Sequence, residues 1–133
     1  MKYPVFIEWG NDKTATGMHI PDIPGAVTAG DTVEDAFKAA VEVAHIMIEE
    51  IVATGGSVPL ATSVEAHKDN PDFSGFGVGY VEVDLSPYLG KTEKANLTMP
   101  SKVIRAIDRH VKVHNLKSRS AYLSELASKD LGV

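Results

Sequence analysis

The segment at residues 94–131 constrains the fold most, because its pattern describes a unit that is not stable by itself. Residues 94–99 (KANLTM) alternate polar and apolar side chains as a β-strand does. Pro100 follows and suits the first turn of a helix. The spacing then predicts a helix over residues 101–114 and a last helix capped by Ser118. The apolar residues expected to face inward are Val103, Ile104, Ile107, Val111, Tyr122, Leu123, Leu126 and Ala127.

Such a unit, near 40 residues long, is too small to bury a core alone, and a single unpaired strand is not stable. Two copies remove both problems, because their strands can pair antiparallel into a ribbon while their helices interlock beneath it. We therefore predict a homodimer formed through residues 94–99. The alternative is an ordinary helical hairpin that serves only dimerisation.

A two-stranded ribbon fits the major groove of DNA, where its outward side chains can read base edges. Lys94, Asn96 and Thr98 would point outward from the ribbon. An Asn suits adenine, a Lys suits guanine, and a Thr suits either a base or a thymine methyl group. These three residues are the predicted base-reading set.

Phosphate contacts are predicted at the start of the last helix, because the free amides of a helix N-terminus bind anions. The residues concerned are Ser118, Arg119 and Ser120. Lys102, at the start of the preceding helix, is a further candidate.

Charge is divided unevenly along the chain. Residues 1–90 hold four Lys or Arg and 14 Asp or Glu, a net charge of −10. Residues 91–133 hold nine basic and four acidic residues, a net charge of +5. This split indicates two parts with different partners, and the basic part suits a polyanion.

The first part of the chain predicts a small α+β layer in the order β-β-β-α-β. The expected strands are residues 3–9 (YPVFIEW), 14–20 (TATGMHI), 26–29 (AVTA) and 77–85 (GVGYVEVDL). Residues 55–76 are polar and rich in Gly, Ser, Pro and Asp, and the sequence leaves open whether residues 57–76 are ordered.

A helix is predicted over residues 31–54. Asp31 and Glu34 have the spacing of a capping box, and a Gly-Gly pair ends the apolar period of 3.6 residues. Three further apolar residues broaden the stripe beyond what one sheet face needs: Val43, Ile46 and Val52. The excess leaves room for a second contact between copies, and hence for a tetramer.

Two resemblances extend this interpretation. The order of a six-residue strand, Pro, helix, short turn and Ser-capped helix at residues 93–131 resembles the ribbon-helix-helix family of DNA-binding proteins. The motif PDIPGAVTAGDTVEDA, together with GYVEVDL, resembles the HicB family of antitoxins. The two resemblances together cover the chain except for residues 57–76.

The HicB resemblance implies a partial ribonuclease-H-like domain that binds and neutralises a small mRNA-cleaving toxin, HicA, while the C-terminal module represses the operon's own promoter. A toxin that binds RNA is expected to be basic, and an acidic domain would attract it. The implied organisation is a partner-binding domain at residues 1–85, a linker at residues 86–92 and a DNA-binding module at residues 93–133.

The sequence gives little support for a catalytic site. A nuclease of the ribonuclease H type needs several carboxylates that converge on two divalent ions. The acidic residues near strand ends are scattered instead: Glu8, Asp12, Asp22 and Asp31. The chain has no Cys, so thiolate chemistry is excluded. We expect neither an enzyme nor a cofactor.

His110 and His114 stand four residues apart and could form a metal pair, but no third ligand is evident. A ligand- or metal-responsive repressor, with the α+β part as its sensor, is the alternative function. No apolar run approaches the roughly 18–20 residues of a membrane span, and the N-terminus lacks the apolar core of a signal peptide. We therefore expect a cytoplasmic protein.

Overall fold

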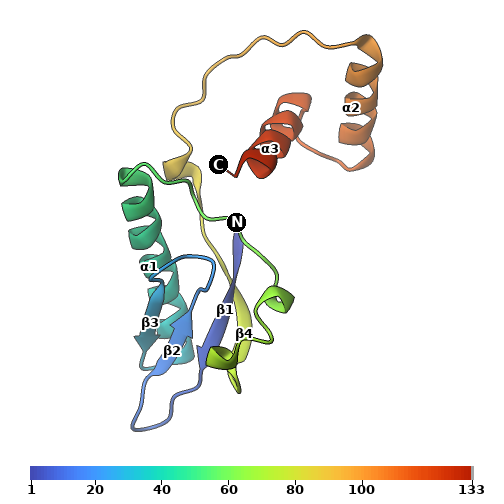
Figure 1. The fold of residues 1–133 in the computed structure, drawn as a ribbon. Coiled ribbons are helices and arrows are strands. Elements are labelled where there is room, and N and C mark those ends of the chain that lie inside the picture. The colour runs from blue at the N-terminus through green and yellow to red at the C-terminus, as the bar shows by residue number, and fades with distance from the viewer. Residues whose placement is uncertain (133) are drawn as a thin grey trace. The chain divides into compact units, whose positions relative to one another are not determined.

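The computed structural model describes residues 1–132, and the chain divides into two compact units, one ending at Leu89 and the other beginning at Gly90. The first unit contains four strands and one long helix, and the second contains two helices (Figure 1). This mixed content confirms the predicted α+β class. Val133, the last residue of the predicted C-terminal module, lies outside the described residues.

The sheet of the first unit is entirely antiparallel, and its strands stand in the order β3-β2-β1-β4. The strands are β1 (Lys2–Glu8), β2 (Thr16–His19), β3 (Val27–Gly30) and β4 (Gly77–Glu82). All four were predicted, with ends that differ by a few residues. β1 occupies the middle of the sheet because its β-branched and aromatic residues are buried on both faces.

One face of the sheet is covered by helix α1 (Val33–Ala53), as Figure 1 shows. The residues of this core include Tyr3, Val5, Ile7, Ala36, Ala40, Ala44 and Ile48, all buried. The helix presents alanines at a spacing of four residues, which allows its backbone to lie close to the strands. The predicted 3.6-residue stripe therefore corresponds to the buried face of α1.

The cap of α1 differs from the prediction. The Oγ1 atom of Thr32 accepts a hydrogen bond from the amide of Asp35 at 3.1 Å, so Thr32 is the N-cap and the Asp31–Glu34 box does not form. At the other end the helix stops as expected. Gly55 has a φ of +88° and its amide donates to the carbonyl of Val52.

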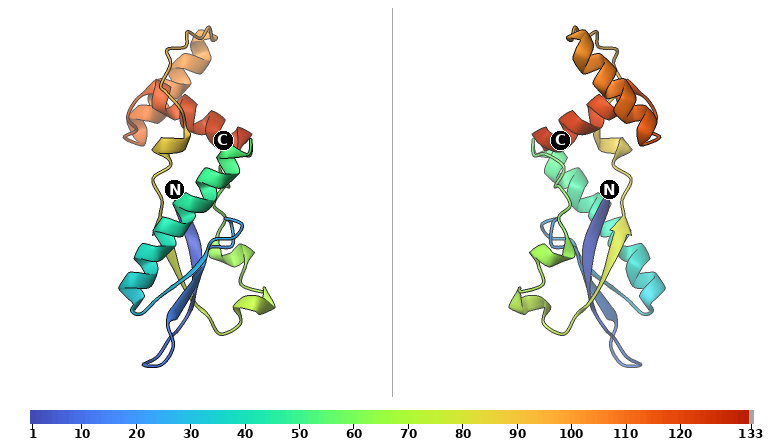
Figure 2. Two further views of the ribbon diagram at one scale, coloured as in Figure 1. Left: turned by 90° about the vertical axis from the view of Figure 1, so that its left-hand side faces the viewer. Right: turned by 90° about the vertical axis from the view of Figure 1, so that its right-hand side faces the viewer.

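The other face of the sheet is covered by residues 57–76 (Figure 2). The Phe73 ring stacks on Phe6 with centroids 4.4 Å apart. Asp22 accepts hydrogen bonds from the amide and hydroxyl of Thr62, both at 2.7 Å, and lies 3.0 Å from His67 Nε2. These contacts hold the polar segment against the sheet, so it is an ordered cover rather than a free loop.

The pairing of β1 with β4 accommodates a proline in a central strand. The ammonium group of Met1 donates to the carbonyl of Val83 at 2.8 Å, and the amide of Val83 donates to the carbonyl of Met1 at 2.9 Å. Hydrogen-bonded and non-hydrogen-bonded pairs alternate from there. Pro4 and Tyr80 form a non-hydrogen-bonded pair, so the N–H that Pro4 lacks would not have bonded to β4.

The first unit ends at an anchored turn. A 3₁₀ turn at Ser86–Tyr88 follows β4, and the hydroxyl of Tyr88 lies 2.5 Å from Nδ1 of His45 on α1. Burial, with the nearby charges of Glu49 and Asp84, raises the pKa of Tyr88. The residue pair fixes the point at which the chain leaves this unit.

The second unit consists of helices α2 (Ser101–Val113) and α3 (Arg119–Leu131), which begin where the sequence predicts them to begin. The predicted strand at residues 94–99 does not form in the single chain. Residues 91–98 are exposed and belong to no strand. A β-strand needs a hydrogen-bonded neighbour, and nothing within residues 1–132 supplies one to this segment.

Within residues 1–132, no helix has both the length and the apolar character that crossing a membrane requires.

Candidate nucleic-acid interface

The three predicted base-reading residues lie on the exposed segment that precedes α2. The side chains of Lys94, Asn96 and Thr98 are all exposed, and so is Leu97, at 68%. Met99 is half-buried next to the start of α2. The polar residues are accessible to a ligand in this state, while the apolar Leu97 lacks the cover that the predicted ribbon would give it.

The start of α3 has the predicted geometry of an anion-binding helix end. Ser118 is the N-cap, and its Oγ atom accepts a hydrogen bond from the amide of Ala121 at 3.0 Å. The amides of Arg119 and Ser120 come before the first intrahelical hydrogen bond, so both are available to an acceptor. The backbone of this turn therefore suits a phosphate better than the Ser118 hydroxyl, which the cap already uses.

The side chain of Arg119 has a partner within the unit. Its Nε and Nη2 atoms donate to the two carboxylate oxygens of Asp108 on α2, at 2.9 and 2.8 Å. Hydrogen bonding from Arg119 holds the pKa of Asp108 below its usual range, and the same carboxylate raises the pKa of Arg119. Both groups are about half exposed. The pair joins the two helices of the unit.

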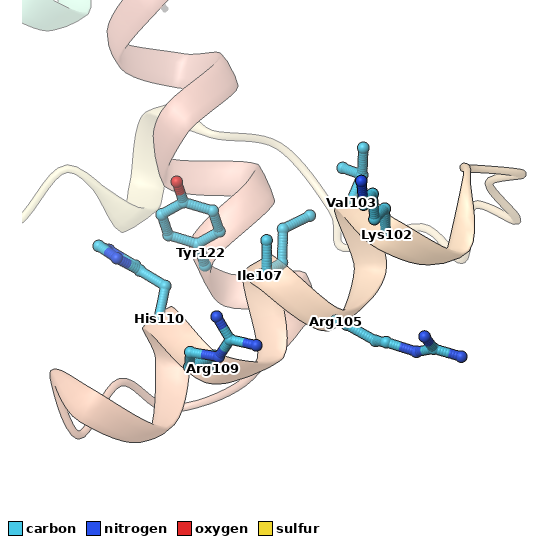
Figure 3. A pocket seen from close by; sticks show the side chains of 8 residues that line it. Lys102, Val103, Arg105, Ile107, Arg109, His110 and Tyr122 are labelled. Atoms are coloured by element: carbon cyan, nitrogen blue, oxygen red, sulfur yellow. The ribbon is translucent and has the colours of Figure 1, made fainter.

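A concavity of about 740 Å³ lies along α2 (Figure 3). Ile107, His110 and Tyr122 converge between the two helices, whereas Arg105 extends away from α3 (Figure 3). The lining residues are Lys102, Val103, Arg105, Ala106, Ile107, Arg109, His110 and Tyr122. The concavity thus combines an apolar floor with a basic margin.

The predicted core of this unit is incompletely covered in the single chain. Ile107 is buried at 8% exposure, but Val103 is 44% and Leu126 is 51% exposed. Two helices with this much uncovered apolar surface do not make a complete core. The apolar floor of the concavity is therefore suited to side chains from outside this copy.

His110 of α2 and His114, the residue that follows the helix at its C-terminal end, pack against each other. The rings of His110 and His114 are 4.3 Å apart, and His110 also lies 4.9 Å from the Tyr122 ring. Within residues 1–132, no group of three or more His, Cys, Asp or Glu side chains is placed to hold a metal ion. The pair is accounted for by aromatic packing at the helix interface.

Three residues of the interface were not singled out from the sequence. Arg105 and Arg109 follow Lys102 at three and seven positions along α2, a spacing that places all three on one side of a helix. This spacing could have identified Arg105 and Arg109 from the sequence. Asp108 could not be identified in the same way, because its pairing with Arg119 joins two separate helices.

The first unit has a different surface. It carries the net charge of −10, since Gly90 adds none. Its exposed large apolar residues include Trp9 at 58%, Ile46 at 60%, Val78 at 54% and Tyr80 at 52%. Asp22, one of the scattered acids, is held by Thr62 and His67 and serves as a structural contact.

Comparison with known proteins gives a consistent result over almost the whole chain. A family model described as "HicB_like antitoxin of bacterial toxin-antitoxin system" matches residues 3–127. An uncharacterised 14.9 kDa protein from the rep-hol intergenic region of Haemophilus phage HP1 (strain HP1c1) is 36% identical over 132 residues, which cover 98% of each chain.

Two solved structures are also similar. The crystal structure of the antitoxin HicB3 matches with a TM-score of 0.81 and 33% identity, covering 98% of this chain and 97% of that one. A chain of the structure described as "HicA3 and HicB3 toxin-antitoxin complex" matches with a TM-score of 0.54 and 31% identity, covering 63% of this chain and 99% of that one.

Proposed function

The chain belongs to the HicB-like antitoxin family of bacterial toxin–antitoxin systems, and from that premise we propose that it is a non-enzymatic antitoxin with two activities. The first unit binds and neutralises a small HicA-type mRNA-cleaving toxin. The second unit forms a dimer that binds operator DNA and represses the chain's own operon.

The similarity to HicB3 over almost the full length of both chains is the observation that carries the proposal. It includes the acidic first unit and the basic second unit together. The similarity to a chain of the HicA3–HicB3 complex supports a toxin as the partner of this chain. An mRNA-cleaving protein must approach a polyanion and is expected to be basic, which suits a unit of net charge −10.

The DNA-binding activity is argued from the second unit. Lys94, Asn96 and Thr98 would read bases from a ribbon of two paired strands, and the amides at Arg119 and Ser120 would hold a phosphate. Lys102 would lie near the backbone of the DNA. The exposed apolar residues of α2 and α3 support dimerisation, because a second copy would cover them.

Two measurements test the two activities separately. Coexpression with the cognate toxin should restore growth of cells that the toxin arrests, and the two proteins should copurify. A mobility shift on the upstream DNA at two salt concentrations should show specific binding by the full chain and none by residues 1–90. Absence of copurification would overturn the antitoxin activity, and absence of binding even at low salt would overturn the repressor activity.

A further inference from the structure

Strand β4 (Gly77–Glu82) forms an open edge of the sheet. β1 pairs with one side of β4, and within residues 1–132 no strand pairs with its other side. An open edge presents a row of amide and carbonyl groups that another strand can use. Proteins commonly protect such edges with Lys, Pro or a bulge, but the sequence of β4, GVGYVE, contains neither Lys nor Pro.

The outward-pointing groups can be assigned from the strand register. Met1 and Val83 form a hydrogen-bonded pair, and every second pair along β4 is of the same kind. The amides and carbonyls of the intervening residues therefore point away from β1. Those residues are Val78, Tyr80 and Glu82.

The side chains of the same residues are uncovered. Val78 is 54% and Tyr80 is 52% exposed, whereas Phe6, opposite Val78 on β1, is 2% exposed because Phe73 stacks on it. The cover formed by residues 57–76 thus protects the middle of the outer face but leaves the β4 edge open. A free edge and two apolar side chains coincide at one place.

We propose that the β4 edge accepts a β-strand of a basic protein partner, and, on the premise of the function proposed above, that this partner is the HicA-type toxin. Main-chain hydrogen bonds from Val78, Tyr80 and Glu82 would provide affinity, and the Val78 and Tyr80 side chains would provide specificity. Tyr80 is the expected hot spot, since an aromatic side chain buries a large area on contact.

Charge favours a basic partner over a second copy of this chain. Pairing of two β4 strands would bring together two units of net charge −10. Centred on Tyr80, an antiparallel pairing would also place the carboxylate of Glu82 in each copy opposite the apolar Val78 of the other copy. A basic strand would instead be attracted to this edge, because Glu82 is exposed at its end and Asp84 follows Glu82 in the sequence.

The test measures binding of the full chain to the purified cognate toxin in a catalytically inactive form. Tyr80→Lys and Val78→Lys place a protective Lys on the proposed edge. Val27→Lys is the matched control, because Val27 is 56% exposed on β3, at the opposite edge of the sheet. We expect about a 30-fold or greater loss of affinity for the β4 variants and about a 2-fold change or less for the control.

A backbone variant separates the main-chain contribution from the side chain. The amide of Tyr80 points away from β1, so Tyr80→Pro removes a donor that the sheet itself does not use. Tyr80→Ala removes the side chain and keeps the donor. Under the proposal Tyr80→Pro weakens toxin binding more than Tyr80→Ala does, while the fluorescence of Trp9 reports whether the unit stays folded.

Hydrogen exchange gives the direct readout. The amides of Val78, Tyr80 and Glu82 should exchange freely in the free protein and become protected in the complex.

Three outcomes would contradict the proposal. If wild-type protein binds the toxin while these amides stay unprotected and Tyr80→Lys binds normally, the edge assignment is wrong and the antitoxin function stands. If the three amides are protected in the free protein in proportion to its concentration, a second copy occupies the edge and the proposal is overturned. If wild-type protein does not bind the toxin, the proposed function fails and the edge assignment fails with it.

Discussion

The guanidinium of Arg119 and the carboxylate of Asp108 form a two-point contact between α3 and α2, with Nε and Nη2 donating at 2.9 and 2.8 Å. A bidentate contact fixes the guanidinium plane as well as its position. Arg119 was predicted to touch phosphate, and the pair shows that such a contact would compete with Asp108 for the same donors. The backbone amides of this turn do not have that competitor.

The competition leads to a prediction about DNA binding. Asp108→Asn removes the negative charge beside Arg119, so the affinity for all DNA sequences should rise and the salt dependence should steepen by about one ion. Arg119→Ala should weaken binding to all sequences and flatten the salt dependence. Fluorescence anisotropy at several salt concentrations measures both. A loss confined to the operator sequence in Arg119→Ala would contradict a phosphate role.

Asn96 carries the prediction about sequence specificity. Asn96→Ala should cost about 1–3 kcal/mol of operator affinity and relax the preference at one base pair, because a bidentate contact to adenine is lost. Binding to unrelated DNA should change little. Competition titrations with single-base operator variants measure the preference. Unchanged operator affinity would show that residues 94–99 do not form the reading ribbon.

Leu97 tests the dimer. Its side chain is 68% exposed in the single chain, so Leu97→Asp should leave an isolated copy intact. In a paired ribbon the same side chain faces the helices, and a buried carboxylate there should weaken the dimer and abolish specific DNA binding. Sedimentation equilibrium measures the dimer. Leu60→Asp, at a 42% exposed position of the first unit, is the control, and an unchanged dimer in Leu97→Asp would exclude the ribbon.

Two isoleucines of α1 provide a matched test of the first core. Ile48 is fully buried against the sheet and Ile46 is 60% exposed. Ile48→Ala should lower the free energy of unfolding by about 2–5 kcal/mol, whereas Ile46→Ala should change it by about 0.5 kcal/mol or less. Urea unfolding followed by Trp9 fluorescence reports this unit, because Trp9 is the single Trp of the chain and packs against Gly77. Equal effects would contradict the assigned helix face.

Tyr3 gives a prediction about alkaline pH. Burial, with a smaller effect from the Asp22 charge, raises the pKa of Tyr3 to about 12. The phenol of an unfolded chain titrates near pH 10, so the unfolded state loses its proton first. The contribution of Tyr3 to stability is therefore complete below about pH 10 and is lost as pH rises through about 12.

The variant Tyr3→Phe tests that linkage. It removes the hydrogen bond from the Tyr3 hydroxyl to the Pro59 carbonyl, 2.6 Å long, and should cost about 1 kcal/mol at pH 8. It should also reduce the fall in stability between pH 9 and 11. Urea unfolding at about pH 9 and about pH 11 measures this fall in stability. An equal fall in wild type and in Tyr3→Phe would contradict the linkage to Tyr3.

The elements of this protein were predictable where their pattern is local. The alternation of β1, the 3.6-residue period of α1 and the Ser118 cap are each contained within one short segment. The cap of α1 was misplaced by one residue, because Asp31 and Thr32 are both good caps and side-chain type alone does not separate them.

Features that depend on distant contacts could not be predicted. The sequence leaves open whether residues 57–76 are ordered, and only the contacts of Phe73 with Phe6 and of Thr62 with Asp22 make them a cover. The predicted strand at residues 94–99 would need a strand of a second chain beside it, which no contact within this chain reveals. The partner of Arg119 is likewise set by how two helices meet, which sequence spacing does not specify.

The register of β4 against β1 decides which side chains the finished protein displays. Met1 and Val83 are separated by 82 positions, so β1 is synthesised long before the strand it must find. If β1 keeps its buried face toward α1, a slip of β4 by one residue would turn Val78 and Tyr80 toward α1 and carry Val81 to the outer face. The misaligned sheet would crowd Phe37 of α1 with a larger side chain where Gly79 now lies, and it would expose the buried Val81. The absence of a side chain at Gly79 thereby favours the native register and leaves Val78 and Tyr80 on the displayed face.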